Sequence, residues 1–231
     1  MAVSQRTAAR ADPAPPASLP RPGGYRRAMP PTSADHVLHA RGSGLVAALT
    51  FDDGPDPRAT PALLDFLREH GIRAVFAVIG ECILRPGGAD ILRRTVAEGH
   101  VLCNHSTSFA DMGDWPADRV RADLEENLRI IRSVVPDADV PYWRAPNGSW
   151  GGTAEVAASL GMRPLAVANT ILDWETQDVP TLVENLRAAM RPGELVLAHD
   201  GGGDRRGTLE AVRSVVTERL AEGWRFTLPA A

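Results

Sequence analysis

The feature that most constrains the fold is an alternation of short apolar runs with longer amphipathic stretches after residue 35. Short apolar runs bounded by turn residues are typical of buried strands, and apolar residues spaced three and four apart are typical of helices. Strands that alternate with helices form parallel sheets covered by those helices. Seven runs are predicted strands: 45–51, 74–80, 100–104, 142–145, 164–169, 195–199 and 224–229.

Helical patterns lie between these strands. The stretch 60–71 has Thr60 as its predicted N-cap, Pro61 at the first helical position and Gly71 at its end. Seven strands alternating with helices predict an α/β fold, either a barrel or a doubly wound sheet. The other helical patterns cover 116–135, 153–161, 179–190 and 207–223.

Composition bounds the organisation and excludes some partners. Residues 1–35 are rich in Pro, Ala and Arg without a hydrophobic period, which predicts a flexible N-terminal arm before a single domain over 36–231. A net charge of −4 offers no broad attraction to nucleic acid or to an anionic membrane. No segment approaches the roughly 18–20 apolar residues of a membrane span. Since the first residues lack the apolar core of a secretion signal, we expect a cytoplasmic protein whose Cys82 and Cys103 are buried free thiols.

Polar residues collect directly after five of the predicted strands. The carboxyl ends of parallel strands meet on one side of such a fold, where active sites are built. The sequence therefore predicts one shared site. The segments are TFDDGPD, NHSTS, RAPNGSW, ILDWE and HDGGGD, in chain order.

Asp52 and Asp53 end the first strand, before a Gly-Pro turn. One carboxylate could bind a metal while the other serves as a general base, or both could cap the next helix. Arg144 could pair with Asp52 inside the site, or form an ordinary surface ion pair.

Two histidines follow strands. His105 could join Asp53 as a metal ligand, although a lone His after a strand is often structural, and a catalytic zinc normally takes three protein ligands. His199 could act as a general acid with its ring held by Asp173, while Asp200 and the following glycines could also simply form a turn.

Three tryptophans stand near these polar positions and are either core residues or platforms for a sugar ring. They are Trp143, Trp150 and Trp174.

With these residues in place, the chain resembles the polysaccharide deacetylase family, which has the NodB-homology domain, over roughly residues 44–228. TFDDGP, NHSTSF, RAPNG, LDW and LVLAHDGGGD resemble the family's five motifs in order. The resemblance implies a distorted (β/α)₇ barrel. It also implies hydrolysis of N- or O-acetyl groups, mostly on sugars.

The resemblance assigns roles to the polar strand ends. Asp52 would be the general base, and His199 would protonate the leaving amine. Arg144 would orient Asp52, and Asp173 would be the partner of His199. Asp53 and His105 would hold a divalent metal, with Zn²⁺ the expected ion. Asn147 would bind substrate, and its backbone N–H would donate to the oxyanion.

Two positions depart from the motifs. The second motif has a metal-binding His where this chain has Phe109, so the metal would be weakly held or absent unless Ser106, Ser108 or Asp111 replaces it. The third motif usually has Tyr where this chain has Asn147, which keeps the backbone donor but makes one wall of the groove smaller and more polar.

We therefore expect a hydrolase that removes an acetyl group from an acetylated sugar, a glycoside or a small biosynthetic intermediate. Two alternatives remain. One is metal-independent acid–base chemistry by Asp52 and His199, such as dehydration, isomerisation, cyclisation or hydrolysis of a non-sugar amide. The other is a barrel that binds carbohydrate without catalysis.

Overall fold

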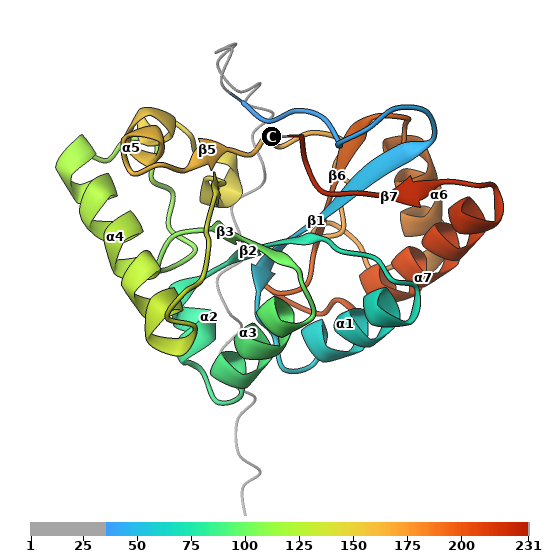
Figure 1. The fold of residues 1–231 in the computed structure, drawn as a ribbon, viewed down its shortest axis with the longest axis horizontal. Coiled ribbons are helices and arrows are strands. Elements are labelled where there is room, and N and C mark those ends of the chain that lie inside the picture. Colours follow the sequence, from blue (N-terminus) through green and yellow to red (C-terminus); the bar gives the residue numbers. More distant parts are fainter. Residues whose placement is uncertain (1–35, 231) are drawn as a thin grey trace, which may run out of the picture.

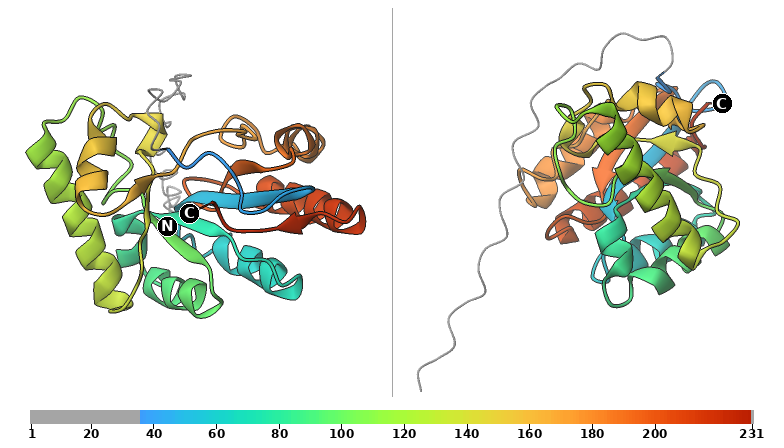
Figure 2. Two further views of the ribbon diagram at one scale, coloured as in Figure 1. Left: turned by 45° about the horizontal axis from the view of Figure 1, so that its top comes forward. Right: turned by 90° about the vertical axis from the view of Figure 1, so that its left-hand side faces the viewer.

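The computed structural model describes residues 36–230, which form a curved parallel sheet with helices on its outside (Figures 1 and 2). Adjacent strands follow the order β5-β4-β3-β2-β1-β6, and β7 pairs with the start of β1. The strands are β1 (Val46–Gly54), β2 (Val75–Val78), β3 (Val101–Asn104), β4 (Tyr142–Trp143), β5 (Arg163–Pro164), β6 (Glu194–His199) and β7 (Arg225–Phe226).

Helices connect the strands as the alternation predicts. The helices are α1 (Thr60–Glu69), α2 (Gly80–Leu84), α3 (Gly88–Ala97), α4 (Ala117–Val134), α5 (Thr153–Ser159), α6 (Val179–Ala189) and α7 (Arg206–Ala221), with a short 3₁₀ turn, η1 (Pro146–Gly148), after β4.

The circle of strands is closed by single bridges instead of a full ladder. Between β5 and β6 the chain runs through 165–171, where Thr170 forms one parallel bridge to Leu197. The predicted distorted (β/α)₇ barrel is therefore confirmed, and within residues 36–230 no ladder joins β5 to β6. The predicted strand 164–169 is shorter than expected, because most of that segment makes only isolated contacts.

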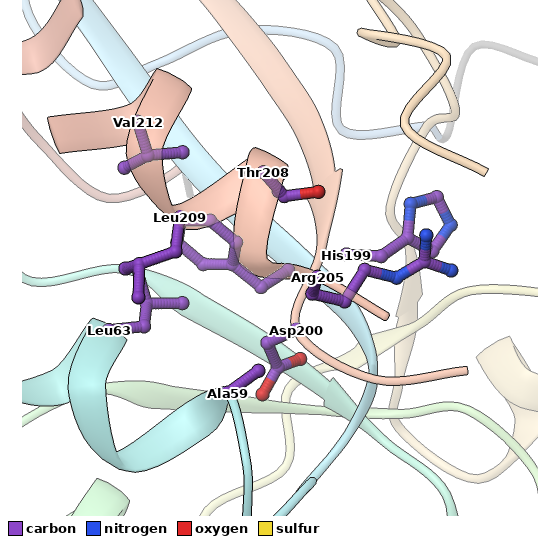
Figure 3. A pocket seen from close by; sticks show the side chains of 9 residues that line it. Ala59, Leu63, His199, Asp200, Arg205, Thr208, Leu209 and Val212 are labelled. Carbon is purple, nitrogen blue, oxygen red and sulfur yellow. The ribbon is translucent and has the colours of Figure 1, made fainter. Parts of the chain in front are cut away.

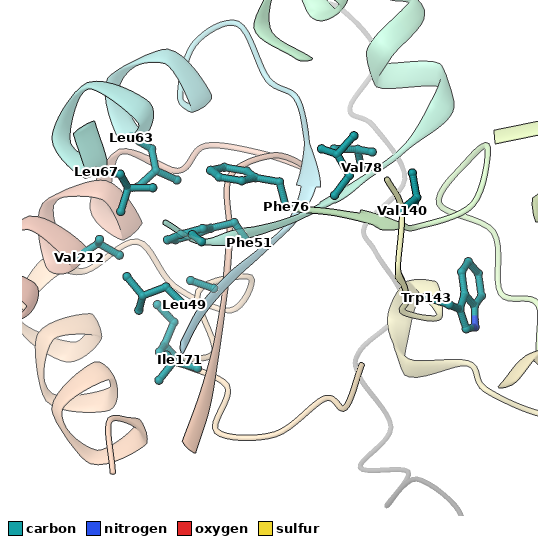
Figure 4. Packing of buried hydrophobic residues seen from close by; sticks show 14 of the residues in the cluster. Leu49, Phe51, Leu63, Leu67, Phe76, Val78, Val140, Trp143, Ile171 and Val212 are labelled. Carbon is teal, nitrogen blue, oxygen red and sulfur yellow. The ribbon is translucent and has the colours of Figure 1, made fainter. Parts of the chain in front are cut away.

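Alternation along the strands divides the core into two parts. Successive residues of a strand point to opposite faces. On β1, Leu49 and Phe51 face outward, and Phe51 and Phe76 point toward Leu63 and Leu67 of α1 (Figure 4). The residues of opposite parity line the inside of the barrel. This inner apolar cluster comprises Val37, Ala40, Val46, Ala48, Val75, Ala77, Cys103, Tyr142, Leu165 and Leu195.

Two local expectations differ from the structure. Residues 80–97, for which no helical stretch was singled out, form α2 and α3. Thr60 is the first residue of α1 and does not cap it, since Ala59 holds the N-cap position without a side-chain hydrogen bond. The hydroxyl of Thr60 bonds elsewhere, to a carboxylate at the carboxyl end of β6.

The remaining predictions concern thiols, membranes and the arm. Cys82 and Cys103 are buried and free, as expected. Within 36–230 no helix has the length and apolar character needed to cross a bilayer. The flexible arm over 1–35 lies outside the described residues, so that prediction and the cytoplasmic location stay predictions.

Candidate active site

The carboxyl ends of β1, β3, β4 and β6 bring the predicted polar residues together inside the barrel. Every second residue of a strand points to the same face. Asp52 therefore faces the inside of the barrel like Ala48 on β1, and Arg144 faces it like Tyr142 on β4. Asp52 is directly opposite His199 in the parallel pairing of β1 with β6. Both side chains are almost completely buried.

Arg144 holds Asp52 in a buried ion pair. Its Nη1 lies 2.6 Å from Oδ1 of Asp52 and 3.0 Å from the hydroxyl of Thr50. The rest of the guanidinium donates to the carbonyls of Leu165 and Ala166. Every edge of the buried cation is thus hydrogen-bonded, which a buried charge requires. The predicted pairing is present, and it is internal instead of on the surface.

His199 is fixed by Asp173. Nδ1 of His199 lies 2.7 Å from Oδ1 of Asp173, whose Oδ2 accepts from the backbone N–H of His199 and from Thr208. Burial alone would lower the pKa of His199, but the Asp173 carboxylate outweighs it and raises that pKa to about 9. The imidazole is therefore protonated at neutral pH. Trp174 packs edge-on against the ring, with centroids 5.5 Å apart.

His105 directs one ring nitrogen at two carboxylates. Its Nδ1 donates to the carbonyl of Arg144 at 2.7 Å, so Nε2 is the nitrogen that faces the site. Nε2 lies 3.4 Å from Oδ1 of Asp53 and 3.7 Å from Oδ2 of Asp52. Within residues 36–230, neither Nε2 nor that Asp52 oxygen has a hydrogen-bond partner.

Asp53 reaches this place through an unusual backbone. Neighbours on a strand point apart, yet Asp53 joins Asp52 in the site because its φ of 75° turns the chain there. Burial would raise the pKa of Asp53, but the imidazoles of His105 and His199 lower it. The Gly-rich turn after β6 packs against it so closely that a Cβ at Gly201 would lie 2.0 Å from the Asp53 carbonyl oxygen.

The donor set fits a divalent cation held by two protein ligands. A carboxylate oxygen and an unprotonated Nε2 are acceptable to Zn²⁺, and the Nδ1 contact to a carbonyl is the usual way of orienting such a ligand. Across residues 36–230, however, no group of three or more His, Cys, Asp or Glu side chains is arranged for a metal.

Two of the three predicted substitute ligands have side chains engaged in other hydrogen bonds. Ser106 donates to Asp123, and Asp111 is exposed and accepts from Asn147. Ser108 contacts Ser106 through its backbone N–H. Within residues 36–230, Asp111 therefore belongs to no group of three His, Cys, Asp or Glu side chains that could hold a metal.

Two of the predicted sugar platforms are core residues. Trp143 has the outward parity of β4, is completely buried and donates to Thr153 of α5. Figure 4 shows it facing away from Phe51. Trp150 is only 4% exposed. A buried ring cannot stack on a substrate, so the prediction for these two is wrong, and Trp174 alone remains partly exposed at the site.

The sequence did not predict the contacts that hold Asp173 and the turn after β1. Arg205 donates to the backbone carbonyl of Asp173, and Asp200 accepts from Thr60 at 2.6 Å. A small cavity between α1 and α7 is lined by His199, Asp200 and Arg205, with the Asp200 carboxyl beside Ala59 (Figure 3). No sequence motif marked these contacts, because the partners lie far apart in the chain.

Comparison with known proteins identifies the family. The family model described as polysaccharide deacetylase matches residues 40–165. A chitooligosaccharide deacetylase of Bradyrhizobium sp. (strain ANU 289) is 37% identical over 79% of this chain and 82% of its own length. The chain belongs to the polysaccharide deacetylase family, which confirms the predicted resemblance and its hydrolase class, acting on carbon–nitrogen bonds other than peptide bonds.

Solved structures agree with this assignment. A peptidoglycan N-acetylglucosamine deacetylase superposes with a TM-score of 0.76 at 26% identity, covering 84% of this chain and 90% of that one. A family 4 acetyl xylan esterase from Clostridium thermocellum, solved with a cobalt ion, gives a TM-score of 0.71 at 26% identity, covering 79% and 86%.

Proposed function

We propose that this chain removes the N-acetyl group from an N-acetylglucosamine unit of a short oligosaccharide or related glycoside, with Asp52 as base and His199 as acid. The substrate class rests on the deacetylases to which the chain is similar. One observation carries the mechanism: Asp52 and His199 are cross-strand neighbours, and each is held by its own buried charged partner.

The chemistry follows from these positions. Asp52 takes a proton from water, and the water oxygen bonds to the acetyl carbon to give a tetrahedral intermediate. His199, protonated at neutral pH, then donates its proton to the amine nitrogen as the carbon–nitrogen bond breaks. Acetate and the free amino sugar leave. Arg144 keeps Asp52 oriented, and Asp173 keeps the imidazole in place.

Asp53 and His105 would hold a divalent cation, and that cation would polarise the acetyl oxygen and the water when bound. The backbone N–H of Asn147, in the 3₁₀ turn η1 after β4, is the proposed donor to the oxyanion. The side chain of Trp174 beside His199 is the proposed wall for the sugar.

Acetate release from chitooligosaccharides of two to six units tests the proposal, with acetylated monosaccharides and acetylated xylan for comparison. We expect release by the wild type and a loss of at least 10³-fold in Asp52→Asn and in His199→Gln. Asp204→Asn, an exposed carboxylate outside the site, is the matched control and should keep full activity. No release from any acetylated substrate, with or without added Zn²⁺, would refute the proposal.

The absence of a third ligand at Phe109 favours one second candidate, acid–base chemistry without a metal on a non-sugar amide. The Asp52 and His199 pair needs no cation for proton transfer. Full activity after exhaustive chelation, with turnover of a non-acetyl amide and none of acetylated sugars, would favour that candidate.

A further inference from the structure

The two departures from the family motifs touch each other. Nδ2 of Asn147 donates to the backbone carbonyl of Phe109 at 3.0 Å and to Oδ1 of Asp111 at 2.9 Å. One side chain therefore ties the loop after β3 to the turn after β4. Neither contact involves the side chain of residue 109, so a change from His to Phe at that position leaves them intact.

We propose that Asn147 is a positioning residue that replaces, without metal, a tie that a metal ligand at position 109 would provide. The proposal rests on the proposed function. A His at 109 bound to the same cation as Asp53 would anchor the loop 106–112 to the end of β1. Phe109 cannot make that link, and the Asn147 amide anchors the same loop to the neighbouring turn instead.

The backbone of Asn147 suits this task. Its φ of 54° and ψ of 17° lie in the left-handed region, which Asn adopts more readily than most residues. This conformation carries the amide toward the loop, while the same residue supplies the proposed oxyanion donor. Anchoring Phe109 therefore also fixes the residue whose N–H must be placed correctly.

Other contacts between the two loops surround this one. His105 donates to the carbonyl of Arg144 at 2.7 Å, and the N–H of Gly113 donates to Ser149 at 2.9 Å. The loop is thus bonded near its start and near its end. Only Asn147 holds its middle by a side chain of the second loop, among the contacts seen in 36–230.

Hydrogen exchange of the metal-free, substrate-free protein tests the proposal independently of any activity. We use Asn147→Gly, which keeps the left-handed backbone, and Asn147→Asp, which keeps the shape but loses the donor. In both, we expect amide exchange in 106–112 to rise about tenfold, the change expected when one or two net hydrogen bonds are lost. Peptides from β1 and α7 should not change.

A second arm tests whether the two ties are interchangeable. Adding Zn²⁺ to the Phe109→His, Asn147→Gly double variant should restore protection of 106–112 to the wild-type level, whereas Zn²⁺ should not restore it in Asn147→Gly alone. Ser149→Ala, which removes the neighbouring cross-loop contact, is the control and should loosen only residues near Gly113.

Three results would overturn the proposal. They are unchanged exchange in both Asn147 variants, an equal rise in β1 and α7, and no restoration by Zn²⁺ in the double variant. If the proposed deacetylation fails while the exchange results hold, the positioning role stands and only the assigned reaction is wrong.

Discussion

The hydroxyl of Thr60 on α1 donates a 2.6 Å hydrogen bond to Oδ2 of Asp200, the residue directly after His199. Thr60 also accepts from the N–H of Asp56, so one hydroxyl joins the turn after β1 to the turn after β6. The fit is close, because a Cβ at Gly54 would lie 2.3 Å from the same carboxylate oxygen. The hydroxyl of Thr60 therefore holds the turn after β1, which carries Asp52 and Asp53, close to the turn after β6, which follows His199.

The burial of the Asp200 carboxyl predicts a pH-dependent stability. Burial raises the pKa of Asp200 to about 7, so between pH 4 and 7 the folded protein keeps a proton that the unfolded chain releases. Stability must then fall as pH rises through that window. At pH 8 we expect the free energy of unfolding of Asp200→Asn, measured by denaturant titration, to exceed that of the wild type by on the order of 1 kcal/mol. At pH 4 we expect no such gain. Asp204→Asn serves as the exposed control, and an equal effect of Asp200→Asn at both pH values would contradict the prediction.

Replacing Asp173 with Asn should move the pH profile of catalysis. Asp173 raises the pKa of His199 to about 9, so the acid is protonated below that pH in the wild type. Without the Asp173 carboxylate, burial of the imidazole lowers its pKa, and the alkaline limb of kcat/KM should shift from near pH 9 to lower pH. At pH 7.5 we expect a loss of about 10²-fold or more. Thr208→Val, which removes only one bond to Asp173, should move the limb much less; an unmoved limb in Asp173→Asn would exclude His199 as the acid.

Even a conservative replacement of Arg144 should impair the protein. Replacement by Met leaves Asp52 buried without its partner, which costs about 3–5 kcal/mol of stability. Arg144→Lys keeps the charge but cannot reach Thr50, Asp52 and the two carbonyls together, so we expect loss of at least 10²-fold in kcat with a smaller loss of stability. Denaturation and steady-state kinetics measure the two effects. Wild-type kcat in Arg144→Lys would show that the hydrogen bonds of the guanidinium to Thr50, Asp52 and the two carbonyls are not all needed.

Replacing Trp143 should mainly reduce stability, whereas replacing Trp174 should mainly weaken substrate binding. Trp143→Ala removes a completely buried ring and should cost about 3–5 kcal/mol of stability. Trp174→Ala removes a partly exposed ring beside His199 and should raise KM for oligosaccharides several-fold at little cost in stability. Thermal melts and KM values together check this. The opposite pattern would place the sugar on the other side of β4.

The strand pattern predicted much of the site, and alternation accounts for both its success and its error. Asp52 and Arg144 are inward-facing positions of their strands, so their meeting could be expected from the sequence. The same rule excludes Trp143, which is adjacent to Arg144 and must face outward. Treating the aromatic neighbours as site residues ignored this parity.

Other features could not be predicted from the pattern. Asp53 enters the site only because its φ is 75°, which breaks the alternation at the end of β1. The contact between Thr60 and Asp200 joins residues 140 positions apart, and local sequence gave Thr60 a more ordinary capping role. Such contacts depend on how the strands are arranged in space, which periodicity does not specify.

The buried pair of Arg144 and Asp52 joins residues 92 positions apart, and Thr50 reaches across 146 positions to β6. A nascent chain that has emerged only as far as β5 lacks His199 and the strand that neighbours Asp52. Contacts so distant in sequence are slow to form, and no proteolytic fragment of moderate length could contain them all. Turnover would therefore be the last property acquired during biosynthesis and the first lost on cleavage, which makes catalysis a sensitive reporter of whether the whole polypeptide is intact.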